Sequence, residues 1–235
     1  MTANLYPGYN SGARPASAPA TAAAAEPSRT PGARWVFGTP GGGLENAHWA
    51  ANADVAAIGR KGELRTAEVL NALSCTDGAA VLHDLRIPIP GMSANIDHIV
   101  VSGTRVLIVD TKVWRPGFFW TIGQHTRRGV RAFPSADKQT MVMGAEAIER
   151  FLAGRHIDAK IVLPLVAVWP SSQHGRSHFW AMRFPGARVI RAETLARRVG
   201  KFVGKPANAL LVATLAELLN NRPHRPEPPK VFTNF

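Results

Sequence analysis

Apolar and polar positions change spacing along the middle of the chain in a way that predicts helices and strands. Residues 55–74 place apolar side chains at helical spacing behind Asp54, a candidate N-cap. An apolar stretch at 79–89 predicts a strand that ends in a proline-rich turn. Residues 95–112 hold two apolar runs around a Ser-Gly-Thr-Arg turn. The first half of this region is therefore predicted to form a helix, a strand and a hairpin.

The second half of the patterned region also predicts helices and strands. Residues 135–154 predict a helix capped by Ser135. Residues 159–170 form an almost continuously apolar run, which is typical of a central strand buried on both faces. A short strand, a basic helix and a last helix are predicted at residues 187–192, 193–202 and 206–221. This order predicts an α/β domain with a mixed central sheet flanked by helices.

The two ends of the chain differ in composition from the patterned region. Residues 1–53 are rich in Ala, Pro, Gly and Ser, which bury too little apolar surface to offset the entropy of ordering, so we expect a disordered tail. The run GTPGGG in this tail lacks the Lys-Ser/Thr of a phosphate loop and a strand before it, which favours a linker. The predicted domain spans residues 54–221, and residues 222–235 form a second tail.

Charge and cysteine content narrow the classes of function. The 235 residues carry a net charge of +12, and all of the excess lies on residues 55–235. Such a domain is a candidate partner of nucleic acid, favoured over an anionic membrane because no basic amphipathic anchor is present, although a solvated basic surface explains the charge equally well. The single cysteine, Cys75, excludes an internal disulfide framework and favours an inert thiol over a nucleophile. With no signal-peptide pattern and no membrane-length apolar run, we expect a cytoplasmic protein.

The predicted hairpin carries two aspartates where strands prefer apolar residues. Asp110 and Lys112 share one face of the second strand, because side chains alternate between faces. A turn centred on the Gly-Thr pair places Asp97 directly opposite Asp110. Opposed like charges destabilise a strand pair, and a divalent cation that prefers oxygen ligands, Mg²⁺ or Mn²⁺, would relieve the repulsion.

Two alternatives to this metal site remain open. A turn of odd length would shift the register by one residue and place the two aspartates on opposite faces. A wet strand end with a salt bridge between Asp110 and Lys112 is the commoner use of such a triplet. That salt bridge does not account for the position of Asp97.

Four segments in this order resemble the nuclease-related domain (NERD) family: GRKGELRTAEVLNAL, VLHDLRIP, NIDHIVVSGTRVLIVDTKVW and DKQTMVMGAEAIERFL. The family is similar to the PD-(D/E)xK nuclease superfamily, and the resemblance covers roughly residues 55–170. It implies a restriction-endonuclease-like core of helix, three strands, helix and strand. It also implies a metal-dependent nuclease that hydrolyses phosphodiester bonds, with DNA as the expected substrate.

The resemblance implies roles for individual residues. Asp97 and Asp110 match the two metal-binding acids, and the backbone carbonyl of Thr111 would join them. Lys112 matches the motif lysine, which would position the attacking water or stabilise the transition state. Glu63 matches an acid of the first helix that would hold the metal directly or through water.

Gln139 matches a glutamine on the helix after the motif, which would contact the nucleic-acid backbone or support the site. Two departures accompany these matches: Asp110 stands where the family more often has Glu, and Met143 stands where related enzymes often have Tyr. The departures favour the alternative of a non-cleaving nucleic-acid-binding module with the same fold in a replication, repair or plasmid-associated assembly. A third alternative is an interaction domain for acidic protein, which predicts weak nucleic-acid binding even in low salt.

Residues 113–133 mix aromatic side chains with arginines, as in grooves where bases stack and phosphates are contacted. The candidate nucleic-acid contacts are Arg115, Arg127, Arg128, Arg131 and Trp120. An equally supported alternative places the aromatic side chains in the core and leaves the arginines solvated. His174 and His178 have metal-ligand spacing but no third ligand, which favours a loop or core pair.

Overall fold

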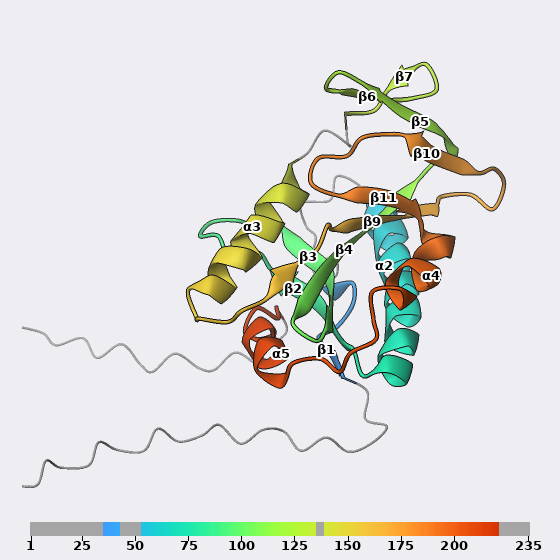
Figure 1. The fold of residues 1–235 in the computed structure, drawn as a ribbon. Helices are drawn as coiled ribbons and strands as arrows, with labels where there is room; N and C mark the ends of the chain where they lie inside the picture. The colour runs from blue at the N-terminus through green and yellow to red at the C-terminus, as the bar shows by residue number, and fades with distance from the viewer. Residues whose placement is uncertain (1–34, 43–52, 135–138, 221–235) are drawn as a thin grey trace, which may run out of the picture.

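The computed structural model describes residues 35–42, 53–134 and 139–220 (Figure 1). Predictions for the rest of the two tails and for the side chain of Cys75 lie outside this description. The prediction that Ser135 caps a helix is wrong, because that helix begins at Thr140 with Gln139 as its N-cap. None of the helices in the described ranges combines the length and the apolar character that a membrane span requires.

A mixed β-sheet forms the centre of the domain (Figure 1). Its main path runs β1, β2, β3, β4, β9, β11, and β8 pairs with β4 beside this path. The bounds are β1 (Val36–Phe37), β2 (Ala80–Arg86), β3 (Asn95–Ser102), β4 (Arg105–Trp114), β8 (Lys160–Ile161), β9 (Leu165–Pro170) and β11 (Arg188–Arg191). The predicted hairpin is the antiparallel pair β3–β4, and β9 lies parallel to β4 inside the sheet. The predicted mixed sheet, hairpin and buried central strand are therefore confirmed.

Helices cover both faces of this sheet (Figure 1). On one face lie α2 (Ala53–Asp77) and α4 (Leu195–Gly200), with the 3-10 turn η2 (Ala192–Thr194) before α4. On the other face lie α3 (Thr140–Ala153) and α5 (Ala209–Ala216). The order α2, β2, β3, β4, α3, β9 is the helix, three-strand, helix, strand core that the resemblance implies.

A second, smaller sheet extends from the end of β4 (Figure 1). Its order is β10, β5, β6, β7, with β5 (Gly117–Ile122), β6 (His125–Arg128), β7 (Arg131–Ala132) and β10 (Ser177–Ala181). Trp114 and Phe119 are buried, and their ring centroids lie 5.4 Å apart. Phe133 and Phe179 pack against the same two rings. For Trp114 and Phe119 the core alternative is confirmed.

A short ordered segment interrupts the predicted N-terminal tail. The strand β1 pairs in parallel with β2, and the N–H of Val81 donates to the carbonyl of Trp35 at 2.7 Å. Gly38 follows with φ of +77°, where a Cβ would lie 2.2 Å from the carbonyl oxygen of His83. The prediction of disorder over residues 1–53 is therefore wrong for residues 35–42, because this apolar segment supplies a strand to the edge of β2.

Candidate active site

The β3–β4 hairpin has the register that a two-residue turn predicts. The ladder between the strands continues as far as His98 paired with Val109, and the next position in the same register holds Asp97 opposite Asp110. The alternative of an odd turn is therefore wrong. The two carboxylates that are separated in the sequence lie side by side on neighbouring strands.

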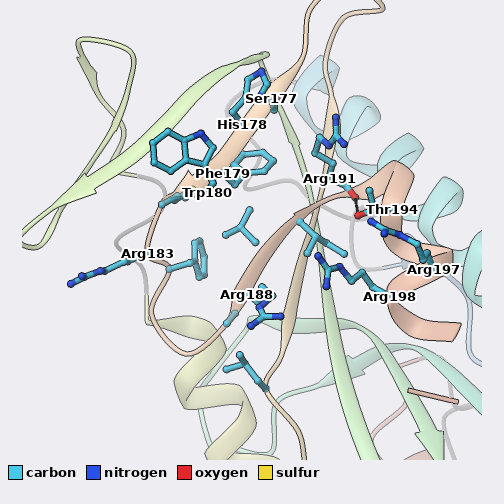
Figure 2. A pocket seen from close by; sticks show the side chains of 16 residues that line it. Ser177, His178, Phe179, Trp180, Arg183, Arg188, Arg191, Thr194, Arg197 and Arg198 are labelled. Carbon is cyan, nitrogen blue, oxygen red and sulfur yellow. Dashed lines mark hydrogen bonds between the residues drawn. The ribbon is translucent and has the colours of Figure 1, made fainter. Parts of the chain in front are cut away.

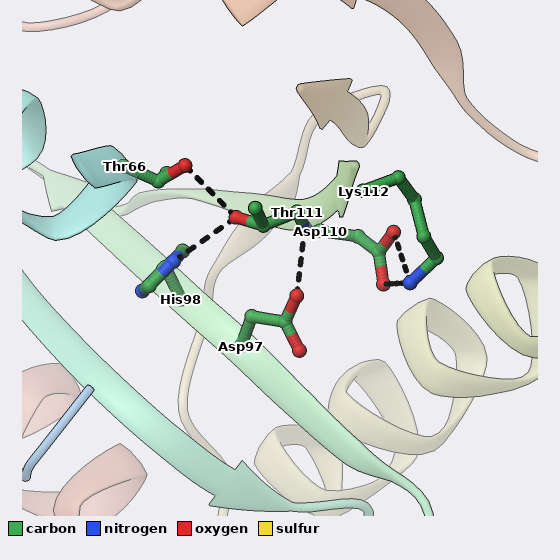
Figure 3. Close-up of polar contacts among 6 residues, drawn as sticks. All are labelled: Thr66, Asp97, His98, Asp110, Thr111 and Lys112. Atoms are coloured by element: carbon green, nitrogen blue, oxygen red, sulfur yellow. Dashed lines mark hydrogen bonds and ion pairs between the residues drawn. The ribbon is translucent and has the colours of Figure 1, made fainter. Parts of the chain in front are cut away.

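Different groups hold the two carboxylates (Figure 3). Oδ2 of Asp97 accepts a hydrogen bond from the backbone N–H of Thr111 at 2.7 Å. Nζ of Lys112 lies 2.8 Å from Oδ1 and 2.8 Å from Oδ2 of Asp110. Only Oδ1 accepts a hydrogen bond, and the buried Oδ2 of Asp110 accepts none from the described residues. The strand therefore presents one buried carboxylate oxygen with spare capacity for a ligand.

A cavity of about 20 Å³ lies between the two aspartates and the start of α3. Its walls include Asp97 and Asp110 from the sheet and Thr140, Met141 and Gly144 from α3. A volume of this size holds about one water molecule or a small ion. The cavity is therefore closed on the helix side by apolar and small residues and opens its polar side to the two carboxylates.

Gln139, the helix residue that was predicted to support the site, lies at the edge of this cavity. Gln139 is the exposed N-cap of α3 and makes no capping hydrogen bond through its side chain. Its neighbour Thr140 lines the cavity, whereas Gln139 does not. Met143, at the position of the family's tyrosine, is 41% exposed. The start of α3 thus borders the site without filling it.

The electrostatics of the group show an excess of negative charge. Burial, followed by the charge of Asp110, raises the pKa of Asp97 well above its ordinary value. Burial also raises the pKa of Glu63 to about 7; the charge of Lys112 lowers it, and those of Asp84 and Asp110 raise it. Burial acts to lower the pKa of Lys112, but the charges of Asp110 and Asp97 outweigh this effect and leave the pKa raised. One ammonium group therefore compensates the acidic group only in part.

Asp84 on β2 is a member of this acidic group that the sequence analysis did not identify. Its backbone φ is 54°, in the left-handed region, where β2 bends away from regular strand geometry. Oδ1 of Asp84 accepts hydrogen bonds from Nδ2 of Asn95 at 2.8 Å and from Nδ2 of Asn220 at 2.9 Å. An aspartate inside a predicted strand was the available signal, because strands disfavour Asp.

A buried polar chain lies behind the strand that carries the acids (Figure 3). The Nδ1 atoms of His83 and His98 are hydrogen-bonded at 2.8 Å, and Nε2 of His98 lies 3.3 Å from Oγ1 of Thr111. Oγ1 of Thr111 donates to Oγ1 of Thr66 at 3.0 Å, and Nε1 of Trp169 donates to the same oxygen at 2.9 Å. This row of hydrogen-bonded side chains anchors Thr111 to α2, β2 and β9. The N–H of Thr111 in turn donates to Asp97.

The buried histidine pair makes stability depend on pH. Burial lowers the pKa of His83 to about 4, and burial followed by the charge of His83 lowers that of His98. The unfolded chain binds these protons below about pH 6.5, whereas the folded protein protonates His83 only near pH 4. The stabilisation is therefore complete above pH 6.5 and is lost as the pH falls toward 4. Between pH 7 and pH 5, His83 alone should cost about 2 kcal/mol of unfolding free energy.

Urea unfolding of the wild type and of His83→Gln at pH 7 and pH 5 measures this loss. Other groups that titrate in this range are common to both proteins, so the difference between them isolates the histidine. The unfolding free energy of the variant should fall about 2 kcal/mol less than that of the wild type. Equal falls in the two proteins would show that His83 does not titrate as its burial implies.

Two of the predicted nucleic-acid contacts serve the β5–β6 hairpin itself. Trp120 and Arg127 are paired across β5 and β6, with the guanidinium 5.9 Å from the indole centroid. Nε1 of Trp120 donates to the carbonyl of Gly129 at 2.8 Å, and Arg127 donates to the carbonyl of Val130 at 2.8 Å. Both side chains therefore donate hydrogen bonds to the turn that joins β6 to β7.

The other predicted basic and histidine residues are spread over the second sheet and its loops. Arg115 is exposed in the turn between β4 and β5, and Arg128 pairs with Arg131 across β6 and β7. His174 is exposed in a loop, and His178 is exposed on β10. Among the residues that the structure describes, no three His, Cys, Asp or Glu side chains cluster closely enough to hold a metal ion by themselves.

The donor set near the cavity suits an ion whose coordination is completed by other molecules. Mg²⁺ is usually held by one or two carboxylates together with waters and substrate phosphates. Asp97 and Asp110 supply two carboxylates on neighbouring strands, and in the described part of the chain Oδ2 of Asp110 is held by the ion pair with Lys112 and by no hydrogen bond. The residues present therefore fit such an ion.

Comparison with known proteins gives one match. Residues 58–168 match the model of NERD, the nuclease-related domain, over slightly less than half of the chain. The matched range contains the acids of α2, β2, β3 and β4 and ends on β9. No curated protein and no solved structure matches the chain.

Proposed function

Residues 58–168 match the model of the nuclease-related domain family, and on that basis we propose that this chain is a metal-dependent nuclease. The proposed reaction is hydrolysis of phosphodiester bonds, with DNA as substrate, Mg²⁺ or Mn²⁺ as the ion and the cytoplasm as location. The observation that carries the proposal is the opposed pair Asp97 and Asp110 at a cavity of about 20 Å³, beside Lys112.

In this proposal the chain's own residues divide the work at the cavity. Asp97, Asp110 and the carbonyl of Thr111 would hold the ion, and Glu63 would reach it through water. When bound, such an ion lowers the pKa of a water ligand and neutralises charge on the phosphate. Lys112 would stabilise negative charge on the phosphate or orient the water, since its raised pKa keeps it protonated.

Gln139 has a separate place in the proposal. It is exposed at the N-cap of α3, next to a residue that lines the cavity. From there its amide would contact the sugar–phosphate backbone as the substrate enters.

A second candidate function is a nucleic-acid-binding module that does not cut. It is favoured by the direct ion pair between Lys112 and Asp110, with Nζ 2.8 Å from the carboxylate, which neutralises one acid without a metal. The exposed Met143 in place of the family's tyrosine supports the same alternative. The two candidates differ in whether the protein cleaves the nucleic acid when a metal ion is supplied.

Cleavage of supercoiled plasmid and of labelled single strands separates the two. We expect cutting with Mg²⁺ or Mn²⁺ that falls at least about 100-fold in EDTA, since the ion contributes several kcal/mol to the transition state. Activity should return when Mg²⁺ is added in excess of EDTA. Salt-sensitive binding without cutting under any of these conditions would overturn the nuclease in favour of the binding module.

A further inference from the structure

A basic groove of about 760 Å³ lies between β10 and the β11–α4 segment (Figure 2). We call it the arginine groove, because its lining includes Arg183, Arg188, Arg191, Arg197 and Arg198. The lining contains no acidic residue, and among the described residues none of these arginines forms an ion pair with a carboxylate. Positive charge that is concentrated in a concave surface attracts a polyanion.

An aromatic platform borders the same groove, and Figure 2 shows its tryptophan, Trp180. Trp180 lines the groove and is 82% exposed, and its ring centroid lies 5.4 Å from that of Phe118, which is 38% exposed. The two rings are tilted by 43° to each other, and the exposed indole of Trp180 is the face on which an unpaired base can stack. The groove thus combines phosphate-binding charge with a stacking surface.

The sheet places the arginine groove next to the candidate active site. Lys112 on β4 pairs with Val168 on β9, and Val168 pairs with Arg191 on β11. Neighbouring strands are about 4.8 Å apart, so the Cα atoms of Lys112 and Arg191 are about 10 Å apart. Residues paired in one row project from the same face of a sheet. Arg191 and Lys112 therefore project from the same face of the sheet, with the buried Val168 between them.

We propose that the arginine groove binds the phosphodiester backbone of single-stranded nucleic acid while Trp180 stacks on an unpaired base. The direction of the strand toward Asp110 rests on the proposed nuclease function; the binding itself does not. Single strands are favoured over duplex because paired bases stack on one another and leave no free face for the indole. The arginines of the groove and Trp180 follow residue 168, so they lie outside the segment that matches the family model.

Fluorescence anisotropy of a labelled single strand in EDTA tests the proposal without cleavage. Arg191→Ala combined with Arg198→Ala should weaken binding at least about 10-fold and reduce the slope of log Kd against log salt by about 1.4, or about 0.7 per lost phosphate contact. The matched control is Arg150→Ala combined with Lys160→Ala, which removes the same charge from exposed positions outside the groove. The control pair should stay within about twofold of the wild type with an unchanged salt slope.

Trp180→Ala isolates the stacking contribution. It should weaken single-strand binding about 10-fold, leave the salt slope unchanged and leave binding of a duplex of equal length unaffected. Thermal unfolding verifies that each variant folds like the wild type.

Three results would overturn the proposal. Equal losses in the groove pair and the control pair would show an effect of overall charge. Equal losses of single-strand and duplex binding in Trp180→Ala would exclude stacking on an unpaired base. Heparin, a polyanion without bases, that binds the wild type as tightly as the single strand would exclude nucleic-acid recognition.

The outcomes for the groove and for the nuclease are independent. Lost binding in the groove variants of a protein that never cuts supports the groove and defeats the nuclease. Normal binding in the groove variants of a protein that does cut defeats the groove and supports the nuclease.

Discussion

Asp110→Asn and Lys112→Met should each reduce metal-dependent cleavage by about 1000-fold or more. The first substitution keeps the shape of the side chain but removes a charge that would hold the ion, and the second removes the ammonium 2.8 Å from that carboxylate. Each tenfold in rate corresponds to 1.36 kcal/mol, and an ion or a positioned cation contributes several kcal/mol to such transition states. Initial rates of plasmid nicking at saturating Mg²⁺ measure the loss.

Glu149→Gln is the matched control for this experiment. It makes the same carboxylate-to-amide change at an exposed position of α3. Cleavage by this variant should remain within about twofold of the wild type, because exposed substitutions away from special contacts change little. Wild-type rates in Asp110→Asn would place the reaction elsewhere in the chain.

Asp97→Asn should have two opposite effects, a loss of cleavage and a gain of stability. Cleavage should fall about 1000-fold because a second charge that would hold the ion is removed. Stability should rise because burial and the charge of Asp110 raise the pKa of Asp97, so ionising it opposes folding. The unfolded chain releases this proton above about pH 4, so the stability of the wild type falls as the pH rises beyond that value. The amide oxygen of Asn can still accept the N–H of Thr111.

Urea unfolding in EDTA measures the stability effect. At pH 8 the variant should exceed the wild type by about 1 kcal/mol, and the gain should be smaller at pH 5. Added Mg²⁺ should stabilise the wild type and not the variant, since only the wild type keeps both carboxylates.

Asp158→Asn, at an exposed position with the same chemical change, should leave stability unchanged. An Asp97→Asn variant that is less stable than the wild type at pH 8 would contradict the inference that ionised Asp97 opposes folding. It would assign Asp97 a structural role instead.

The local parts of the site follow from the sequence alone. Two apolar runs around a Ser-Gly-Thr-Arg sequence predict a hairpin, and a two-residue turn sets Asp97 opposite Asp110. Alternation along one strand likewise places Asp110 beside Lys112. Both inferences depend on residues close in sequence, for which a turn length and a period of two are sufficient.

Local patterns did not predict which residues of the smaller sheet are buried. Residues 113–133 favour neither a groove nor a core by composition, and the structure divides them between the two. Phe119 is buried against Trp114, whereas Phe118 lies exposed against Trp180, which is far away in the sequence. Which face of β5 is buried depends on β10, a strand that no local pattern assigns to it.

The sequence by itself determined the mixed α/β core and the hairpin, and placed Asp110 and Lys112 on one face of a strand; the structure then decided between the two hairpin registers. Only the tertiary structure decided that β1 joins β2, that His83 meets His98, and that Arg191 lies in the same row of the sheet as Lys112. Local patterns specify turns and exposed faces, because these depend on neighbouring residues. The pairing of strands distant in sequence is chosen by the packing of the whole core, which no short segment encodes.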